Sequence, residues 1–128
     1  MEHHTFFACK DKSSILHLIT GSKEAAAKCL GSNFMELDPA KSAGAGEKHL
    51  PCVSVNGSLV TVSVGSVAHP MSAEHSIEWV CLETTQGSQW KKLSPDGEPK
   101  AEFALAQGDK PVAAYAYCNL HGFWKTDI

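Results

Sequence analysis

The sequence lacks any long apolar run and any excess of basic residues. Although 43% of its 128 residues are hydrophobic, no stretch approaches the roughly 20 apolar residues of a membrane-spanning helix. The formal net charge of −3 gives no overall attraction to nucleic acid or to an anionic membrane. The first ten residues, MEHHTFFACK, contain no basic segment followed by an apolar one. We therefore expect a cytoplasmic protein with neither nucleic-acid nor membrane partners.

A tight cysteine framework is also missing. The cysteines are odd in number and widely spaced, at Cys9, Cys29, Cys52, Cys81 and Cys118. This pattern is more typical of reduced thiols in a cytoplasm than of a disulfide scaffold. The Cys118 thiol is then free to act as a metal ligand, whereas Cys52 and Cys81 lie within predicted strands and are interpreted as core residues.

Alternating hydrophobicity begins near residue 49, after a small and flexible stretch, KSAGAGEK (41–48), where we place a domain boundary. Residues 50–55 and 59–64 form a predicted hairpin with an Asn56-Gly57 turn. Further strands are predicted in HSIEWVCLETT, SQWKKL, AEFALA and VAAYAYC, with turns at Gln86-Gly87 and QGDKP. Short strands with turns between them indicate an all-β protein, an immunoglobulin-like antiparallel β-sandwich over residues 41–128.

The first 40 residues give a weaker pattern. TFFACK and SSILHLIT could be strands. KEAAAKCL consists of good helix formers but is too short to be stable alone. The sequence leaves the structure of this part open.

Four histidines and one cysteine in the second part are candidate metal ligands: His49, His69, His75, Cys118 and His121. A single loop histidine is more often a solvated surface residue, and a free cysteine is more often a small buried hydrophobe. Pro70 could stiffen the loop between His69 and His75, or it could be ordinary turn chemistry. Cys118 and His121 stand three positions apart in a loop that can wrap both around an ion.

The number and type of these side chains restrict the metal. Five ligands exceed the four of a structural zinc site. Blue-copper sites use two histidines, one cysteine and a weak axial ligand, which leaves histidines unaccounted for. Iron with one open coordination position fits best. Four neutral imidazoles and one thiolate leave a ferrous centre near +1, which attracts a small anion and favours redox chemistry on an oxygen species.

Three stretches, EKHLP (47–51), GSVAHPMSAEHSIEW (65–79) and YCNLHGFWK (117–125), resemble the signature stretches of superoxide reductases, the desulfoferrodoxin and neelaredoxin family. The resemblance implies a β-sandwich in which His49, His69, His75 and His121 bind iron equatorially and Cys118 binds it axially. It also implies that Glu47 and Lys48 act at the open position, where superoxide binds.

The N-terminal part departs from the two-iron members of this family, whose small desulforedoxin-like domain holds a second iron with two cysteine pairs. Here Lys12 and Lys28 stand where partners of Cys9 and Cys29 are expected. An ammonium group is a hydrogen-bond donor and no metal ligand. The resemblance therefore implies a vestigial domain over residues 1–40, with one iron (Fe2+/Fe3+) per chain. Cys9 and Cys29 are interpreted as packing residues, and His3, His4 and His17 as structural.

The implied activity is the one-electron reduction of superoxide to hydrogen peroxide, with a rubredoxin-like electron donor and a homodimeric assembly. Two alternatives remain at this point. One is a non-catalytic iron protein that only transfers electrons. The other is a sandwich interaction module without a functional metal.

Overall fold

The computed structural model describes residues 4–42, 44 and 46–128. It contains two compact units, Met1–Asp38 and Pro39–Ile128, called here the N-terminal and the C-terminal unit. His3, which was interpreted as structural, lies outside the described residues. The same holds for residues 43 and 45 of the predicted domain boundary.

The N-terminal unit is a three-stranded antiparallel sheet with one helix. The sheet has the order β2-β1-β3, and its strands are β1 (Thr5–Cys9), β2 (Ile15–Leu18) and β3 (Phe34–Glu36). Both strands considered from the sequence are present, whereas β3 was not predicted. β3 is only three residues long, too short for alternation to reveal it.

Helix α1 (Lys23–Leu30) forms in the KEAAAKCL stretch. Ser22 caps its start by accepting a hydrogen bond from the backbone of Ala25, at 3.1 Å. The helix ends at Gly31, which adopts a positive φ of 71°. Cys29 on this helix is exposed, so its interpretation as a packing residue is wrong, because α1 buries none of its residues.

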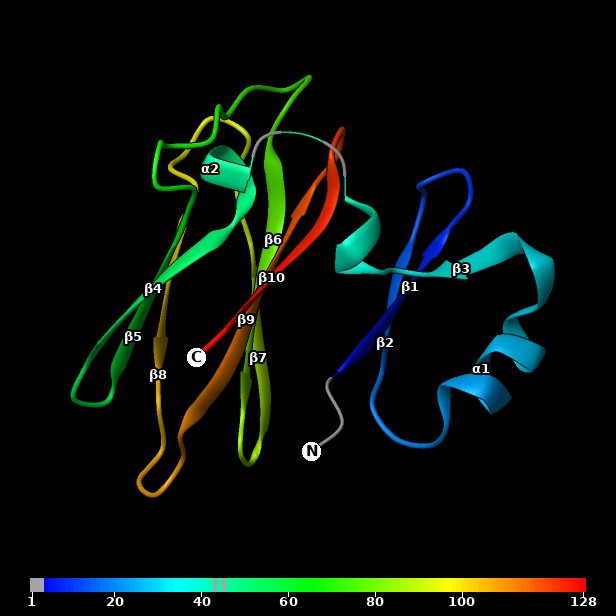
Figure 1. The fold of residues 1–128 in the computed structure, drawn as a ribbon, viewed down its shortest axis with the longest axis horizontal. Coiled ribbons are helices and arrows are strands. Elements are labelled where there is room, and N and C mark those ends of the chain that lie inside the picture. Colours follow the sequence, from blue (N-terminus) through cyan, green and yellow to red (C-terminus); the bar gives the residue numbers. More distant parts are fainter. Residues whose placement is uncertain (1–3, 43, 45) are drawn as a thin grey trace. The chain divides into compact units, whose positions relative to one another are not determined.

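The C-terminal unit is a sandwich of two antiparallel sheets (Figure 1), which confirms the all-β fold. The larger sheet has the order β10-β9-β6-β7 and the smaller one β4-β5-β8. The strands are β4 (Pro51–Asn56), β5 (Leu59–Val64), β6 (Ile77–Thr84), β7 (Gly87–Lys92), β8 (Lys100–Ala104), β9 (Pro111–Cys118) and β10 (Gly122–Asp127). The short helices η2 (Pro39–Lys41) and α2 (Gly46–His49) of this unit lie outside its sheets, and a third short helix, η1 (Gly31–Asn33), belongs to the N-terminal unit.

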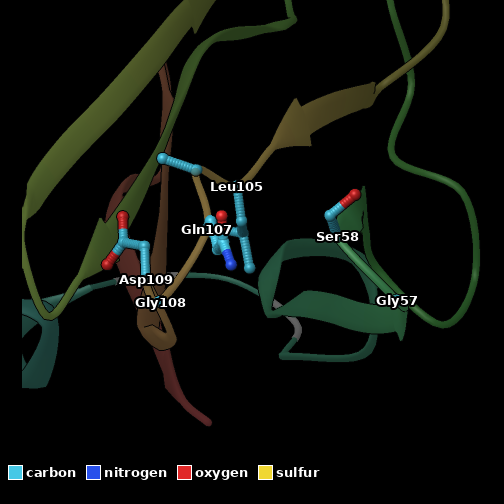
Figure 2. Close-up of a pocket in the computed structure, with 7 residues that line it drawn as sticks. Gly57, Ser58, Leu105, Gln107, Gly108 and Asp109 are labelled. Atoms are coloured by element: carbon cyan, nitrogen blue, oxygen red, sulfur yellow. The ribbon is translucent and has the colours of Figure 1, made fainter.

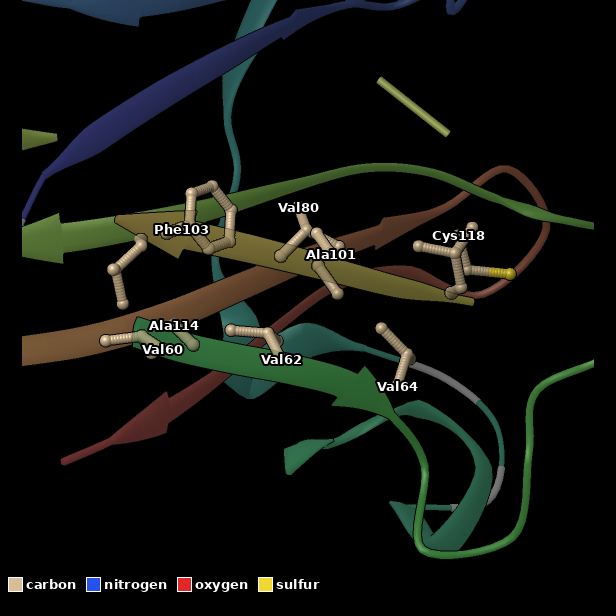
Figure 3. Close-up of a cluster of buried hydrophobic side chains, with 11 residues drawn as sticks. Val60, Val62, Val64, Val80, Ala101, Phe103, Ala114 and Cys118 are labelled. Carbon is tan, nitrogen blue, oxygen red and sulfur yellow. The ribbon is translucent and has the colours of Figure 1, made fainter. Parts of the chain in front are cut away.

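Alternation along the strands builds the core between these two sheets. On β5, Val60, Val62 and Val64 are at most 1% exposed, as the sequence predicted. They pack against alternate residues of β6, β8 and β9 (Figure 3). Figure 3 shows Cys118 at one end of this cluster, with its sulfur directed toward the loops at that end. The core thus fixes the strand end from which Cys118 projects.

Three details differ from the sequence prediction. Both hairpin turns lie one residue from their predicted positions, at Gly57-Ser58 and at Thr85-Gln86. Cys52 is exposed rather than buried, because Val53 faces the core and neighbouring residues point to opposite faces of a strand. Cys81 is fully buried as predicted, and burial raises the pKa of its thiol to about 12.

One end of the sandwich gathers three connections: α2, the segment between β5 and β6, and the turn between β9 and β10 (Figure 1). Every candidate ligand belongs to one of these connections or to the strand end beside it. In the described part of the chain, no helix is long and apolar enough to cross a membrane.

Candidate metal centre

The candidate ligands come from three segments. His49 ends α2 and precedes β4, so it lies in a helical turn and not at the strand start that the sequence predicted. This short turn ends before Pro51, because proline disfavours a helical backbone at the residue that precedes it. His69 and His75 lie in the β5–β6 segment, Cys118 ends β9, and His121 precedes β10.

The structure brings all five predicted side chains together. One donor atom from each of them lies within 4.8 Å of all the others. His49 Nε2 is 3.0 Å from His121 Nδ1 and 3.2 Å from His69 Nε2. Cys118 Sγ is 3.9 Å from His121 Nδ1. His49, His69 and Cys118 are buried, whereas His75 and His121 are partly exposed.

These distances fit a shared cation. Two nitrogens that each lie about 2.1 Å from one ion, at right angles to each other, are about 3.0 Å apart. In addition, the Nε2 atom of His75 is buried without a hydrogen-bond partner. A buried polar atom without a partner is costly, and a metal bond removes that cost. The donor set therefore fits a metal ion.

The four imidazole rings form a cycle. Neighbouring rings in the order His49, His69, His75, His121 and back to His49 have centroids 4.7 to 5.1 Å apart, at interplanar angles of 70° to 81°. His49 and His75 face each other across the cycle, with centroids 6.5 Å apart. Four nitrogens can therefore surround one point, and the Cys118 sulfur supplies a fifth donor.

The proton of His69 is fixed by the backbone. Nδ1 of His69 lies 2.6 Å from the carbonyl oxygen of Pro70, so this nitrogen carries the proton and donates it. Nε2 then presents a lone pair to the cluster, as a metal ligand requires. Pro70 thus contributes through its carbonyl as well as by restricting the backbone of His69.

Burial lowers the pKa of two of the four imidazoles, those of His69 and His75. Burial lowers the pKa of His69 to about 4, against an opposing effect of the hydrogen bond to Pro70. Burial also lowers the pKa of His75, and the positive charge of Lys48 adds to this effect. Neutral imidazoles can bind a metal ion near pH 7 without first losing a proton.

Asn119 joins two of the three segments. Its Oδ1 accepts a hydrogen bond from the backbone of Ser76 at 3.0 Å, and its Nδ2 donates one to the carbonyl of Glu74 at 2.9 Å. These two residues flank His75. The side chain therefore fixes His75 relative to the loop that carries Cys118 and His121, a contact that the sequence did not predict.

Gly65 joins α2 to the β5–β6 segment. The backbone of Gly65 donates to the carbonyl of Leu50, and Val67 donates to that of Glu47, both at 3.0 Å. A Cβ atom at Gly65 would lie 2.3 Å from the Val67 carbonyl oxygen and 2.8 Å from that of Lys48. Only glycine fits this close approach of the β5–β6 segment to α2.

Glu47 and Lys48, the predicted catalytic residues, are exposed side chains on α2, directly before His49. Lys48 directly precedes the candidate ligand His49, and its positive charge lowers the pKa of His75. The structure therefore provides a cationic and an anionic group that solvent can reach at the edge of the candidate centre.

No other group of three or more His, Cys, Asp or Glu side chains in residues 4–42, 44 and 46–128 could hold a metal ion. A separate pocket of about 450 Å³ lies between the turn that joins β4 to β5 and the connection from β8 to β9 (Figure 2). It contains neither histidine nor cysteine, and its Asp109 accepts hydrogen bonds from Thr85 and Gln86. These bonds join the β8–β9 connection to the turn between β6 and β7, which gives Asp109 a structural role.

Comparison with known proteins bears on this arrangement. The family model described as Desulfoferrodoxin matches residues 41–127. The chain belongs to the desulfoferrodoxin family. A desulfoferrodoxin of Nitratidesulfovibrio vulgaris is 43% identical over 99 residues, which are 77% of either chain. One of Clostridium acetobutylicum is 48% identical over 82 residues, and the match spans 64% of this chain and 63% of that protein's length.

Solved structures of the family share the fold. The crystal structure of the superoxide reductase from Treponema pallidum is similar with a TM-score of 0.84 and 38% identity, covering 98% of this chain and 100% of that one. A superoxide reductase (1Fe-SOR) from Giardia intestinalis gives a TM-score of 0.56 and 32% identity, covering 64% of this chain and 97% of that one.

Proposed function

We propose that this desulfoferrodoxin-family protein is a superoxide reductase, which reduces superoxide by one electron to hydrogen peroxide at a mononuclear non-haem iron. The observation that carries the proposal is the meeting of four imidazoles and one thiolate within 4.8 Å. Iron accepts this mixed set of five donors, whereas a structural zinc site takes four. The similarity to the Treponema pallidum superoxide reductase supports the same activity.

We propose His49, His69, His75, His121 and Cys118 as the ligands of one iron per chain. Bound iron supplies the electron by passing from Fe2+ to Fe3+. Four neutral imidazoles and one thiolate leave positive charge at the site, which attracts an anion.

Lys48 and Glu47 act on the substrate in this proposal. Superoxide needs two protons as well as one electron to become hydrogen peroxide. The Lys48 ammonium is exposed on the residue directly before the candidate ligand His49, so it can attract superoxide and deliver protons through water. The Glu47 carboxylate is exposed on the same turn and can occupy the open position after the substrate has reacted.

The electron balance requires a partner. Each turnover leaves the iron oxidised, so an external donor must reduce it, and the family resemblance favours a rubredoxin-like protein. A homodimeric state is proposed on the same resemblance. The five cysteines are all free thiols, which supports a reducing cytoplasm.

We propose that the N-terminal unit is a desulforedoxin-like domain without iron. It provides Cys9 and Cys29, which are too few thiolates for a four-thiolate iron site. Lys12 adopts a positive φ of 63° in the turn after β1, where the two-iron members would have a second cysteine.

Addition of azide or cyanide to the oxidised iron protein tests the open position. A superoxide reductase is expected to bind these anions and change its visible spectrum. An iron protein that only transfers electrons needs no open position, so an unchanged spectrum at saturating azide and cyanide would favour that alternative.

A further inference from the structure

Trp124 contacts two of the candidate ligands with one side chain. It lies on β10 and is 9% exposed. Its ring is stacked on the imidazole of His49, with centroids 4.8 Å apart and an interplanar angle of 17°. Its Nε1 atom donates a hydrogen bond of 3.1 Å to the backbone carbonyl of His121.

These two contacts restrain parts of the site that the chain does not otherwise link closely. His49 and His121 are 72 positions apart, yet their facing nitrogens lie 3.0 Å apart. Two nitrogen lone pairs at this distance repel each other unless a cation or a proton lies between them. The stacked indole limits rotation of the His49 ring, and the bond to the carbonyl fixes the turn that carries His121.

Gly44 leaves room for the same two imidazole rings because it has no side chain. A Cβ atom at this position would lie 3.0 Å from Cγ of His121 and 3.1 Å from Cε1 of His49. A Cβ atom at Gly44 would therefore crowd both rings, and one or both would have to shift. Its φ of 116° is also one that other residues rarely adopt.

We propose that Trp124 is a positioning residue for His49 and His121, and that Gly44 completes this role by closing the space beside both rings. This inference rests on the proposed iron site. If Trp124 only packed in the sandwich, its loss would lower the stability of the metal-free protein and leave the properties of bound iron unchanged. A positioning role also predicts changes in iron release and in the visible spectrum.

The test compares Trp124→Leu, Trp124→Phe and Gly44→Ala in the full chain loaded with iron. Three quantities are measured: the rate of iron release to a chelator, the visible spectrum, and the unfolding midpoint of the metal-free protein. We expect Trp124→Leu to release iron about 10 to 100 times faster, the scale of changes beside metal ligands. Trp124→Phe keeps a ring but loses the hydrogen bond, so an intermediate rate is expected.

Gly44→Ala should release iron several times faster and shift the spectrum. Trp90→Phe is the matched tryptophan control because Trp90 is 62% exposed. Gly21→Ala is the matched glycine control, since Gly21 has a similar φ of 102° with nothing within 4 Å of a Cβ. Both controls should release iron as the unchanged protein does.

Wild-type release rates and spectra in Trp124→Leu would overturn the inference. If that variant does not fold, the same result in Trp124→Phe together with Gly44→Ala would overturn it. If the unchanged protein binds no iron at all, the proposed function fails instead, so the two failures can be told apart.

Discussion

His75 presents a buried Nε2 atom that has no hydrogen-bond partner in the protein. Its ring lies 4.7 Å from that of His69, which itself presents Nε2 because its other nitrogen donates to Pro70. We predict that His75→Ala and His69→Ala each weaken iron binding by more than about tenfold, because each removes one of five donors. Competition with a chelator measures the iron affinity of each variant.

His17→Ala is the control for these variants. His17 belongs to the N-terminal unit, where its ring is stacked on Phe6 at 4.4 Å. This variant should keep its iron even if the N-terminal unit becomes less stable. Full iron affinity and an unchanged spectrum in His75→Ala would show that the proposed ligand set is incorrect.

Lys48 combines an exposed ammonium with a position directly before the candidate ligand His49. We predict that Lys48→Ala keeps iron and its visible spectrum but reacts with superoxide at least about tenfold more slowly. A rate change of this size is what local electrostatic steering can supply. Lys48→Arg should keep much of the rate because it keeps the charge. Rapid mixing with superoxide at several salt concentrations measures both effects.

The salt dependence of the rate should also become smaller in Lys48→Ala, because a missing charge cannot be screened. Lys110→Ala is the control, since Lys110 is an exposed lysine in the connection between β8 and β9. A rate equal to that of the unchanged protein at low salt would mean that Lys48 is an ordinary surface residue.

The strands could be predicted where alternation was strong. On β5 the alternating valines face the core, and all six strands expected in the C-terminal unit are present. β10 was not predicted as a strand, although it supplies the edge of the larger sheet. Buried and exposed side chains do not alternate cleanly along Gly122–Asp127, because the neighbours Phe123 and Trp124 are both buried.

The candidate ligands could be predicted, but the residues that hold them in place could not. Five metal-binding side chains with a characteristic spacing are visible in the sequence itself. The role of Trp124 depends on stacking against His49, and that of Gly44 on a close approach to the same ring. Such contacts join positions far apart in the chain, so no local pattern reveals them.

Gly65 connects α2 to the β5–β6 segment, and its φ is 86°. We predict that Gly65→Ala destabilises the metal-free protein by about 1 to 3 kcal/mol and speeds iron release. The reason is that an added Cβ would lie 2.3 Å from a backbone oxygen, so α2 or the β5–β6 segment must move. Thermal unfolding and release to a chelator measure the two effects.

Gly57→Ala is the matched control. Gly57 also has a positive φ, 61°, but a Cβ atom there would meet nothing within 4 Å. Gly57→Ala should therefore lose only the modest stability that a positive φ costs a residue with a side chain, and it should release iron at the normal rate. The explanation for Gly65 would be wrong if both variants unfolded at the same temperature and released iron equally.

The two units differ in their metal-binding side chains. Among the described residues, the one cluster able to hold a metal ion belongs to the C-terminal unit. We predict close to one iron per chain, measured by metal analysis of the purified protein. Cys9→Ser and Cys29→Ser should keep this iron, whereas Cys118→Ser should lose its iron–thiolate absorption. Two irons per chain, or a four-thiolate spectrum, would contradict the proposed vestigial domain.

The most direct test of the proposed activity is the stoichiometry of one reaction with superoxide. The protein is loaded with Fe2+, kept free of oxygen and excess reductant, and mixed with a known amount of superoxide. We predict that each superoxide consumed oxidises one iron and yields one hydrogen peroxide, with no oxygen formed. Oxygen release with half a peroxide per superoxide, or iron that stays Fe2+ while superoxide persists, would contradict the assignment as a superoxide reductase.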